Sequence, residues 1–546
     1  MEVSSPRAAK PSTARAFDSF ALFVSVGVLF YLWTLNYNKL GSFYDYSIVT
    51  DAAGKLSAGL HPFRDFSSAL QSMPMWLARA CELIFGPSYL ALAYGNLVLT
   101  LILFSLILHY ARKSFPFLLS IPLALSITVA SSLQHGIIWY NSIALLLLSA
   151  VTLKCADLLR TRKIRLPDVL QLSALLLMIG MTKLNFDAVA IGTAALFAFV
   201  GFISCKPSTE VQNKRYYLIW IALCLAACAA LPFIEVLANR TDLHTWAREV
   251  VIIPASRASG LASLFRPGFY FREWNAFYPG TLLNGSVFFC LLIYGFITYA
   301  VVIQFFEAPK NERSENFKGL VVRLALLCLF WLSTCLLALT NVEIESLTLC
   351  YCLVGLIAMR VSGEFSGHQL QKILRNSSAV LAVYFLLVGG VSVARHSRIA
   401  YRGNDFADAS LYNAGSTAGT AASNPEFLRG VMLSPQAVMR LTAAGKVVKD
   451  NGPASVYWGP GMEIMNEIYG GVTDPAFPLW YHFRVTVRDA DAQTLIHAID
   501  RSRADVFVSD PPWLAELPEE VKLYFDESWE SQYQYAPLSV YKRRAR

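Results

Sequence analysis

Carboxylate side chains follow the first long apolar block of the chain. Asp45 lies between two tyrosines, the second being Tyr46, and Asp51 and Asp65 come after it. A carboxylate within hydrogen-bond reach of a hydroxyl group can take its proton as the oxygen attacks an electrophile. Asp45 is the first candidate for such a general base and Asp51 the second. The alternative role for Asp45 and for Asp51 is that of a solvated helix residue. For Asp65, in the run at 62–66, the alternative is a side chain that orders a turn.

Other polar side chains lie at the ends of apolar blocks. Tyr140 and Asn141 begin one block, and Lys183 and Asn185 lie between two others. A cation beside hydrocarbon is costly unless it pairs or reaches the interface, so Lys183 is either a binding residue or an interfacial anchor. For Tyr140 and Asn141, interfacial and helix-start roles are the more common explanation. Glu345 precedes a later block, where a solvated turn is the alternative to a binding role.

The segment 237–284 is rich in arginine and aromatic residues. Arg257 and Arg266 are among its arginines, and Trp246 and Tyr270 are among its rings. A guanidinium can hold a phosphate through two parallel hydrogen bonds, while an aromatic ring stacks on a sugar. Arginines of a membrane protein also contact lipid headgroups, so we expect no more than two of them at a binding site.

Apolar blocks are the elements that position these residues. The chain has 55% hydrophobic and 15% charged residues, whereas soluble domains carry about 25% charged residues. Blocks of roughly 17–25 residues have the length that a helix needs to cross the hydrocarbon core. We therefore expect a mostly α-helical, polytopic membrane protein with about eleven transmembrane helices. The predicted spans are 17–36, 88–109, 116–132, 137–153, 168–181, 186–204, 216–236, 285–306, 320–340, 346–360 and 377–394.

The distribution of basic residues predicts the orientation. The net charge is +8, but the residues from Arg395 onward sum to −2 and the remainder to +10. This positive excess lies in alternate short connections between the spans, and such connections stay in the cytoplasm. We expect a cytoplasmic N-terminus, with the loops 37–87 and 237–284 and the C-terminal part outside. The same distribution argues against nucleic acid as a partner.

The last part of the chain has the pattern of a small α/β domain. We divide the chain into a transmembrane domain at 1–394, a linker at 395–425 that is rich in small and polar residues, and an extracytoplasmic domain at 426–546. Within this domain, the apolar patterns predict strands at 454–458, 504–509 and 538–542 and helices at 491–501 and 513–524.

The first outer loop resembles that of the GT-C fold glycosyltransferases, in particular the RgtA/B/C/D-like and aminoarabinose-transferase-like enzymes. In that family an acidic pair is followed, fourteen residues after its first member, by a glycine and then by a Pro-Tyr-x-Asp-Phe run. Asp45 and Gly59 have that spacing, and residues 62–66 read Pro-Phe-Arg-Asp-Phe. The family's second acid is Tyr46 here, which weakens the case for a metal held by adjacent carboxylates.

The resemblance covers most of the chain. The runs Trp-Tyr-Asn at 139–141, Thr-Lys-Leu-Asn at 182–185 and Ala-Asp-Val-Phe-Val at 504–508 also match. It implies an inverting glycosyltransferase that moves a sugar from a polyprenyl-phosphate donor to a glycan or lipid acceptor of the cell envelope. The expected location is the outer face of a bacterial cytoplasmic membrane.

The resemblance also implies a role for each candidate. Asp45 is the expected general base, and Lys183, Arg257 and Arg266 are expected at the donor phosphate, whose departing charge requires fixed cations. The expected substrate contacts are Tyr46, Asp51, Asp65, Tyr140, Asn141, Asn185 and Glu345. No metal ligand is assigned, and a divalent metal is the one cofactor left open.

Two other functions fit a polytopic membrane protein. A secondary transporter or lipid flippase also has many spans, although transporters usually carry broken helices at the midplane and related halves. In this chain the polar residues concentrate in outer loops instead. A non-catalytic membrane scaffold whose C-terminal domain binds glycan is the second alternative.

Overall fold

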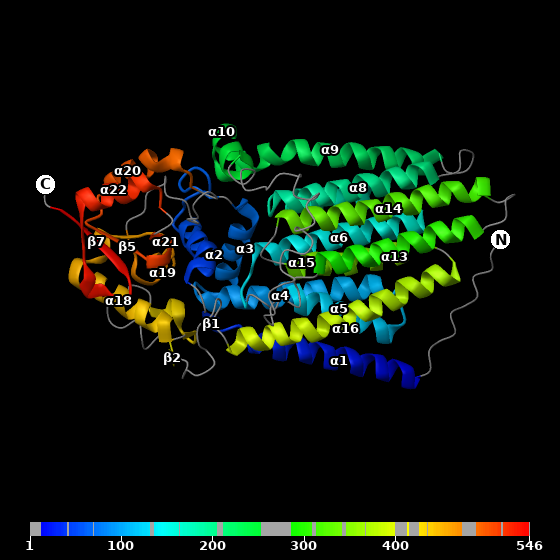
Figure 1. Cartoon of the computed structure of the whole chain (residues 1–546), viewed down its shortest axis with the longest axis horizontal. Helices are drawn as coiled ribbons and strands as arrows, with labels where there is room; N and C mark the ends of the chain where they lie inside the picture. Colours follow the sequence, from blue (N-terminus) through cyan, green and yellow to red (C-terminus); the bar gives the residue numbers. More distant parts are fainter. Residues whose placement is uncertain are drawn as a thin grey trace.

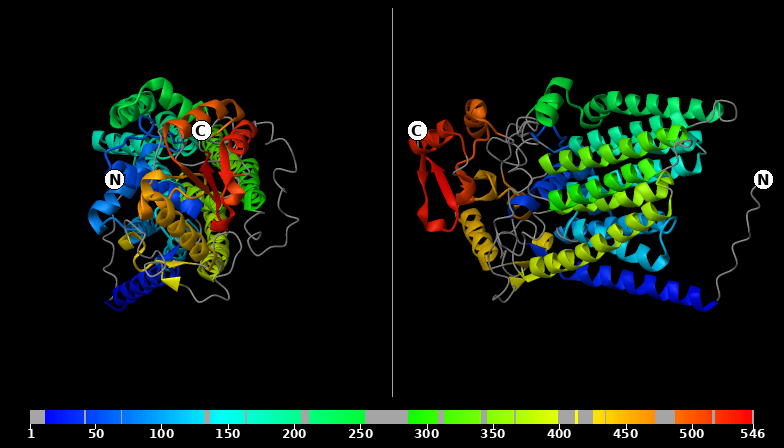
Figure 2. Two further views of the ribbon diagram at one scale, coloured as in Figure 1. Left: turned by 90° about the vertical axis from the view of Figure 1, so that its left-hand side faces the viewer. Right: turned by 45° about the vertical axis from the view of Figure 1, so that its right-hand side comes forward.

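A computed structural model shows a long bundle of helices with a smaller globular part at one end (Figure 1). We call this part the tail; it comprises the described residues from Tyr412 onward. Two further views show the tail at the same end of the bundle (Figure 2). The structure describes residues 12–40, 43–68, 70–131, 136–162, 164–204, 211–252, 286–307, 313–340, 345–365, 367–398, 412–413, 425–433, 435–471, 487–514 and 517–544.

Each predicted span coincides with a helix of the bundle, and consecutive members of this set run in opposite directions (Figure 1). The helices are α1 (Ser12–Thr34), α4 (Tyr89–Ala111), α5 (Phe117–Ser131), α6 (Tyr140–Thr161), α7 (Leu166–Gly180), α8 (Leu184–Ser204), α9 (Val211–Asn239), α13 (Ser286–Glu307), α14 (Arg313–Thr340), α15 (Glu345–Ser362) and α16 (His368–Arg398).

Seven helices within the described residues are long and apolar enough to cross a membrane, which makes the chain a multi-pass membrane protein. They belong to α1, α4, α6, α8, α9, α13 and α14. The apolar parts of α5, α7 and α15 are shorter. At 1.5 Å per residue, a 15-residue helix such as α5 spans about 22 Å, less than the hydrocarbon core of about 30 Å. The total of eleven crossings therefore stays a prediction.

Helix α6 lies at the centre of the bundle. It packs against α8 on one side and α15 on another, and 83% of its most apolar window is buried inside the protein. Its apolar residues point in all directions, as expected of a helix surrounded by other helices. Close packing around α6 holds its first residues, Tyr140 and Asn141, in a fixed position at the end of the bundle that faces the tail.

Two helices of the segment 37–87 cover this end of the bundle. Helix α2 (Phe43–Ser57) buries Ile48, Ala52 and Leu56, which recur at helical spacing along one face. Gly59 ends it in a left-handed conformation, with φ of 80°, while the Leu60 N–H donates to the Lys55 carbonyl. Such helix ends favour glycine. The sequence patterns did not predict the second helix, α3 (Ser72–Phe85).

The tail contains a four-stranded sheet in the order β4-β5-β7-β6. The parallel pair β4 (Val456–Trp458) and β5 (Val506–Ser509) is followed by antiparallel pairing of β5 with β7 (Ser539–Arg543) and of β7 with β6 (Trp529–Ser531). The three predicted strands are confirmed, and β6 was not predicted. The helices of the tail are α18 (Pro435–Asn451), α19 (Met465–Tyr469), α20 (Ala492–Arg501), α21 (Pro511–Leu514) and α22 (Glu519–Ser528).

One helix prediction in the tail was wrong. The segment 513–524 was expected to form a single helix, but α21 ends at Leu514 and α22 begins after Pro518. Proline lacks a backbone N–H and restricts the residue before it, so it starts helices and does not continue them.

A second, smaller sheet ties the tail to the bundle. Strand β1 (Lys39–Leu40) follows α1 and pairs in parallel with β3 (Met432–Leu433), which also pairs with β2 (Tyr412–Asn413). The Met432 N–H donates to the Asn38 carbonyl at 2.7 Å. Since β3 belongs to the tail and β1 to the segment 37–87, parts of the chain almost 400 residues apart share backbone hydrogen bonds.

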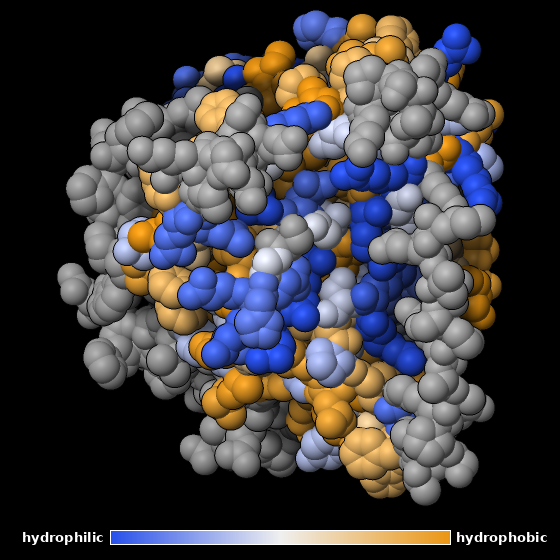
Figure 3. Space-filling model, turned by 90° about the vertical axis from the view of Figure 1, so that its right-hand side faces the viewer, coloured by the Kyte–Doolittle hydropathy of each residue, from blue (hydrophilic) through white to orange (hydrophobic). Residues whose placement is uncertain are grey.

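Hydrophilic side chains gather on the end of the bundle opposite the tail (Figure 3). Two of its cations pair with carboxylates of neighbouring helices: Lys113 with Asp157 at 2.6 Å and Lys154 with Asp168 at 2.6 Å. The charge bias that predicts a cytoplasmic N-terminus therefore corresponds to one physical face of the protein.

This orientation predicts which residues can be labelled from outside. In a variant whose exposed Cys328 is serine, a cysteine at the exposed tail position Glu530 should react with a membrane-impermeant maleimide in right-side-out vesicles. A cysteine at Arg112, at the opposite end, should react only after the membrane is opened. The reverse pattern would contradict the orientation.

Candidate functional site

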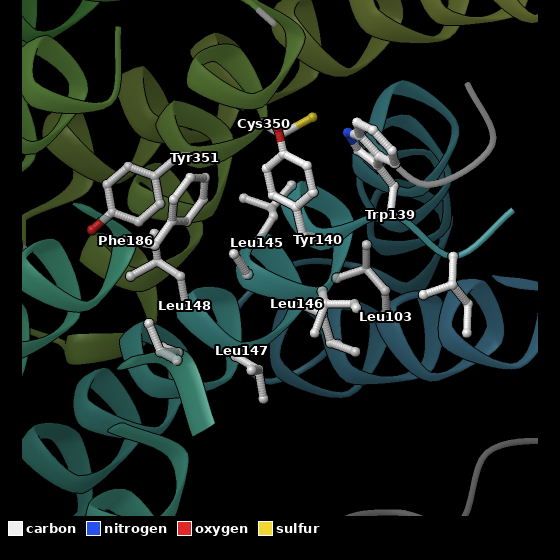
Figure 4. Packing of buried hydrophobic residues seen from close by; sticks show 14 of the residues in the cluster. Leu103, Trp139, Tyr140, Leu145, Leu146, Leu147, Leu148, Phe186, Cys350 and Tyr351 are labelled. Atoms are coloured by element: carbon white, nitrogen blue, oxygen red, sulfur yellow. The ribbon is translucent and has the colours of Figure 1, made fainter. Parts of the chain in front are cut away.

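Lys183 and Asn141 meet at the end of the bundle that faces the tail. Lys183 lies in the short connection between α7 and α8, and its Nζ donates to Oδ1 of Asn141 in the first turn of α6. The same ammonium lies 5.0 Å from the ring centre of Tyr140 and 5.4 Å from that of Phe186. Figure 4 shows the Tyr140 and Phe186 rings within the packed core, with Trp139 beside Tyr140. The structure thus brings together two of the runs that sequence reasoning singled out.

The surroundings of Lys183 are suited to an anion. Asn141 is only 1% exposed, and its amide nitrogen has no acceptor in the part of the chain that the structure describes. A buried donor left without a partner costs free energy unless water or a ligand satisfies it. A half-buried ammonium beside such a donor can bind an anion more strongly than a solvated lysine, because less water screens the charge.

The segment 37–87 packs directly on this connection. The N–H of Met73, at the start of α3, donates to the Met181 carbonyl at 2.9 Å. The adjacent Ser72 N–H lies 3.4 Å from the carboxylate of Glu235, at the end of α9. Glu235 in turn accepts from Nδ2 of Asn239 at 2.7 Å. These contacts fix α3 and α9 against the connection that carries Lys183.

Sequence reasoning missed two buried acids near this end of the bundle. Glu235 has no exposed surface, and Asp187, in the first turn of α8, is 6% exposed. Oδ1 of Asp187 has no hydrogen-bond partner among the described residues, and its other oxygen lies 3.1 Å from the place where a side chain at Gly180 would begin. The available signal was an acid inside an apolar block, which is rare in lipid and often functional.

The predicted general base lies on α2. Asp45 and Tyr46 belong to its first turn, and the structure does not describe their side chains. The motif glycine, Gly59, has a clear local role because it ends the same helix. The fourteen residues from Asp45 to Gly59 therefore correspond to most of α2 and the left-handed residue that ends it.

Asp51 faces the tail. It is 1% exposed, pairs with Lys55 one turn later on α2, and accepts from Nδ2 of Asn466 in the tail at 3.2 Å. These contacts account for its burial, so its assignment as a substrate contact rests on the resemblance alone.

Asp65 orders the turn that follows α2. Its carboxylate accepts from the backbone N–H of His61 at 2.8 Å and from Nε of Arg64 at 2.9 Å. The hydrogen bond from Arg64 holds the pKa of Asp65 below its ordinary value. These contacts match the alternative of a turn-ordering residue.

The other predicted site residues are placed only in part. Asn185 is the second residue of α8 and half-buried. Glu345 is the first residue of α15, and its side chain lies outside the described residues, as do Arg257 and Arg266 entirely. Among the residues that the structure describes, no group of three or more His, Cys, Asp or Glu side chains is arranged to hold a metal ion.

Solved glycosyltransferase structures match this chain over nearly its whole length. ArnT from Cupriavidus metallidurans, solved bound to undecaprenyl phosphate, matches 96% of this chain and 98% of its own at 12% identity and a TM-score of 0.49. AglB from Archaeoglobus fulgidus, an archaeal oligosaccharyltransferase solved with an inhibitory peptide and a dolichol-phosphate, matches 98% of this chain and 75% of its own at 10% identity and a TM-score of 0.46.

A further Archaeoglobus fulgidus oligosaccharyltransferase structure, tethered to an acceptor peptide, matches 97% of this chain and 74% of its own at 12% identity and a TM-score of 0.42. No family model and no curated protein matches the sequence. The matched structures are of the kind that the sequence resemblance predicted. At these TM-scores they assign no role to any residue, and the roles below rest on this chain's own residues.

The contact between Lys183 and Asn141 can be tested by stability. Asn141→Leu should lower the free energy of unfolding by about 1–3 kcal/mol, because it removes the hydrogen bond that Asn141 accepts from the Lys183 ammonium. Adding Lys183→Met should recover part of that loss, since removing both partners leaves no orphaned polar group. Unfolding of all four proteins in sodium dodecyl sulfate would give the coupling energy, and strictly additive effects would contradict the contact.

Proposed function

We propose that the protein is an inverting glycosyltransferase that uses a polyprenyl-phosphate sugar as donor. The observation that carries the proposal is the contact of Lys183 with Asn141 at the end of the membrane bundle. It places a half-buried cation beside a buried donor that has no acceptor among the described residues. A lipid phosphate is an anion that reaches this level of a membrane with its hydrocarbon tail still among apolar helices. Helix α2, which carries Asp45, lies at the same end of the bundle (Figure 1).

Lys183 is the proposed donor-phosphate ligand. When the sugar leaves, the phosphate gains negative charge at the oxygen that held the anomeric carbon. A fixed ammonium and an amide N–H near that oxygen stabilise this charge without first having to reorganise. Arg257 and Arg266 complete the proposal for the phosphate, as arginines that can supply a bidentate fork.

Asp45 is the proposed general base. The acceptor hydroxyl oxygen attacks the anomeric carbon from the side opposite the phosphate, its proton passes to the Asp45 carboxylate, and the bond to the phosphate oxygen breaks. A single displacement of this kind inverts the anomeric centre. The proposed substrate contacts are Tyr46, Asp51, Asp65, Tyr140, Asn141, Asn185 and Glu345.

The proposed setting is the outer face of a bacterial cytoplasmic membrane. The chain would cross eleven times with its N-terminus inside, and the acceptor, a glycan or lipid of the cell envelope, would enter beneath the tail. Tyr46 replaces the second acid of the family motif, so the proposed chemistry uses a single carboxylate and a divalent metal is left open.

The buried acids favour a second candidate, a proton-coupled transporter. Acids within spanning helices often carry protons or ions. However, Asp187 lies in the first turn of α8 and Glu235 in the last turn of α9, whereas transporters bind their substrates near the midplane. The glycosyltransferase therefore explains the positions of the polar residues better.

Asp45→Asn tests the base. With the purified protein in lipid vesicles and a panel of undecaprenyl-phosphate sugars, sugar transfer to a cell-envelope extract should fall by a factor of about 100 to 10,000, the usual contribution of a general base. Binding of undecaprenyl phosphate should be unchanged. Asp526→Asn, at an exposed position of the tail, is the matched control. An unchanged transfer rate in Asp45→Asn would contradict the assignment of Asp45 as the general base.

Lys183→Met tests the phosphate ligand through binding alone. Undecaprenyl phosphate should bind about ten- to a hundredfold more weakly, since a charged hydrogen bond is worth about 1.5–3 kcal/mol. Lys449→Met removes an exposed tail lysine and should leave the affinity unchanged. Equal affinities for the two variants would place the phosphate elsewhere.

A further inference from the structure

Helix α19 of the tail packs on α2, and one of its side chains comes unusually close to the α2 backbone. A methyl group at Gly54 would lie 1.7 Å from Oε1 of Glu467, so the carboxyl group occupies the space that any other residue would fill. Glycine inside a helix costs about 1 kcal/mol relative to alanine. Close approach of another group is the usual reason for its presence.

Other polar groups surround this contact. From α2, Asp51 pairs with Lys55 and accepts from Asn466, the neighbour of Glu467. From α3, the buried Glu82 accepts from Ser57 at 3.3 Å and pairs with Arg79 at 3.5 Å. On the other side of α19, Tyr469 donates to a backbone carbonyl of α18, while the cation Arg440 of α18 pairs with Asp510.

The charges around Glu467 favour its neutral form. Three carboxyl groups share this region with two cations, Lys55 and Arg79. Burial, followed by the Asp51 and Glu82 carboxylates, raises the pKa of Glu467 to about 8, although Lys55 opposes the shift. At neutral pH the docked carboxyl group therefore keeps its proton, and a neutral carboxyl can approach the α2 backbone without the cost of burying a charge.

We propose that Glu467 is a positioning residue: seated on Gly54, it holds α2, the helix that carries Asp45, against the tail in a proton-dependent manner. The inference deepens the proposed function, on which its catalytic consequence rests. Gly54 lies nine residues after Asp45 on one helix, about 14 Å along its axis, so Glu467 acts on the base through α2 and does not touch the reacting atoms.

The direction of the pH effect follows from proton linkage. An exposed glutamate has the ordinary pKa of 4.5, and the docked one about 8, so docking takes up a proton between these values. Below pH 4.5 both states are protonated and docking is strongest. As the pH rises toward 8, docking weakens by up to about tenfold per pH unit, and it changes no further above that pH.

Hydrogen exchange measures the docking without reference to activity. In the intact protein in lipid vesicles, the amide protection of α2, corrected for intrinsic exchange, should fall at least tenfold between pH 6 and pH 8.5. Glu467→Gln, which mimics the neutral carboxyl, should keep the protection at both pH values. Glu530→Gln, an exposed tail position, should behave like the parent protein.

Gly54→Ala separates docking from helix propensity. Alanine is the better helix former, so propensity alone would raise the protection of α2. If Glu467 holds the helix, the added methyl group displaces it and the protection should fall at both pH values. Raised protection in Gly54→Ala, or a pH response in Glu467→Gln equal to that of the parent, would overturn the proposal.

The catalytic consequence has its own readout. If Asp45 is the base, the transfer rate of the parent protein should decline as the pH rises toward 8. Glu467→Gln should lose this decline and keep the maximum rate. An unchanged transfer rate in Asp45→Asn would contradict the proposed role of Asp45. The hydrogen-exchange measurements on α2 would still decide whether Glu467 holds this helix.

Discussion

The low polarity of the membrane interior is the constraint on which the arrangement depends. A charged or hydrogen-bonding group surrounded by hydrocarbon must find a partner inside the protein, so polar chemistry is driven toward the helix ends. Lys183, Asn141 and Glu235 all follow this rule, since each lies where a helix of the bundle begins or ends at the tail. One end of the bundle thus collects cations, amides and acids from helices that are far apart in sequence.

Two kinds of contact position the residues at this end of the bundle. Asn141 lies in the first turn of α6, a helix packed on all sides, so the dispersion contacts of a close-packed core set the position of its amide. Asp45 lies on α2, whose outer contacts include the polar cluster of Asp51 and Glu467. Core packing therefore sets the position of Asn141, whereas the helix of the proposed base contacts Glu467, a carboxyl group with a raised pKa.

The sequence predicted more of the bundle than of the site. Hydrophobic blocks of membrane length identify helices because lipid selects for length and apolarity alone. Nothing in the pattern says which helix ends are neighbours, so the contact between Lys183 and Asn141 needed the packed structure. The approach of Glu467 to Gly54 joins residues more than 400 positions apart, although an internal helix glycine was a hint. Pro518 was a visible signal that the helix predicted at 513–524 would break.

The tail is attached to the chain on both sides of Asp45. Strand β1 immediately precedes α2 and pairs with β3 of the tail, while Gly54, near the other end of α2, receives Glu467 of the tail. Asp45 lies between these two attachments. Buried apolar residues of α19 and β3 join the core cluster of the bundle, whereas those of α20 and α22 form a separate core. The part of the tail nearest the membrane is thus continuous with the bundle, so α2 is clamped at both ends by a platform that is itself fixed. The contact between Gly54 and Glu467 thus joins α2 to the part of the tail that shares the bundle's core.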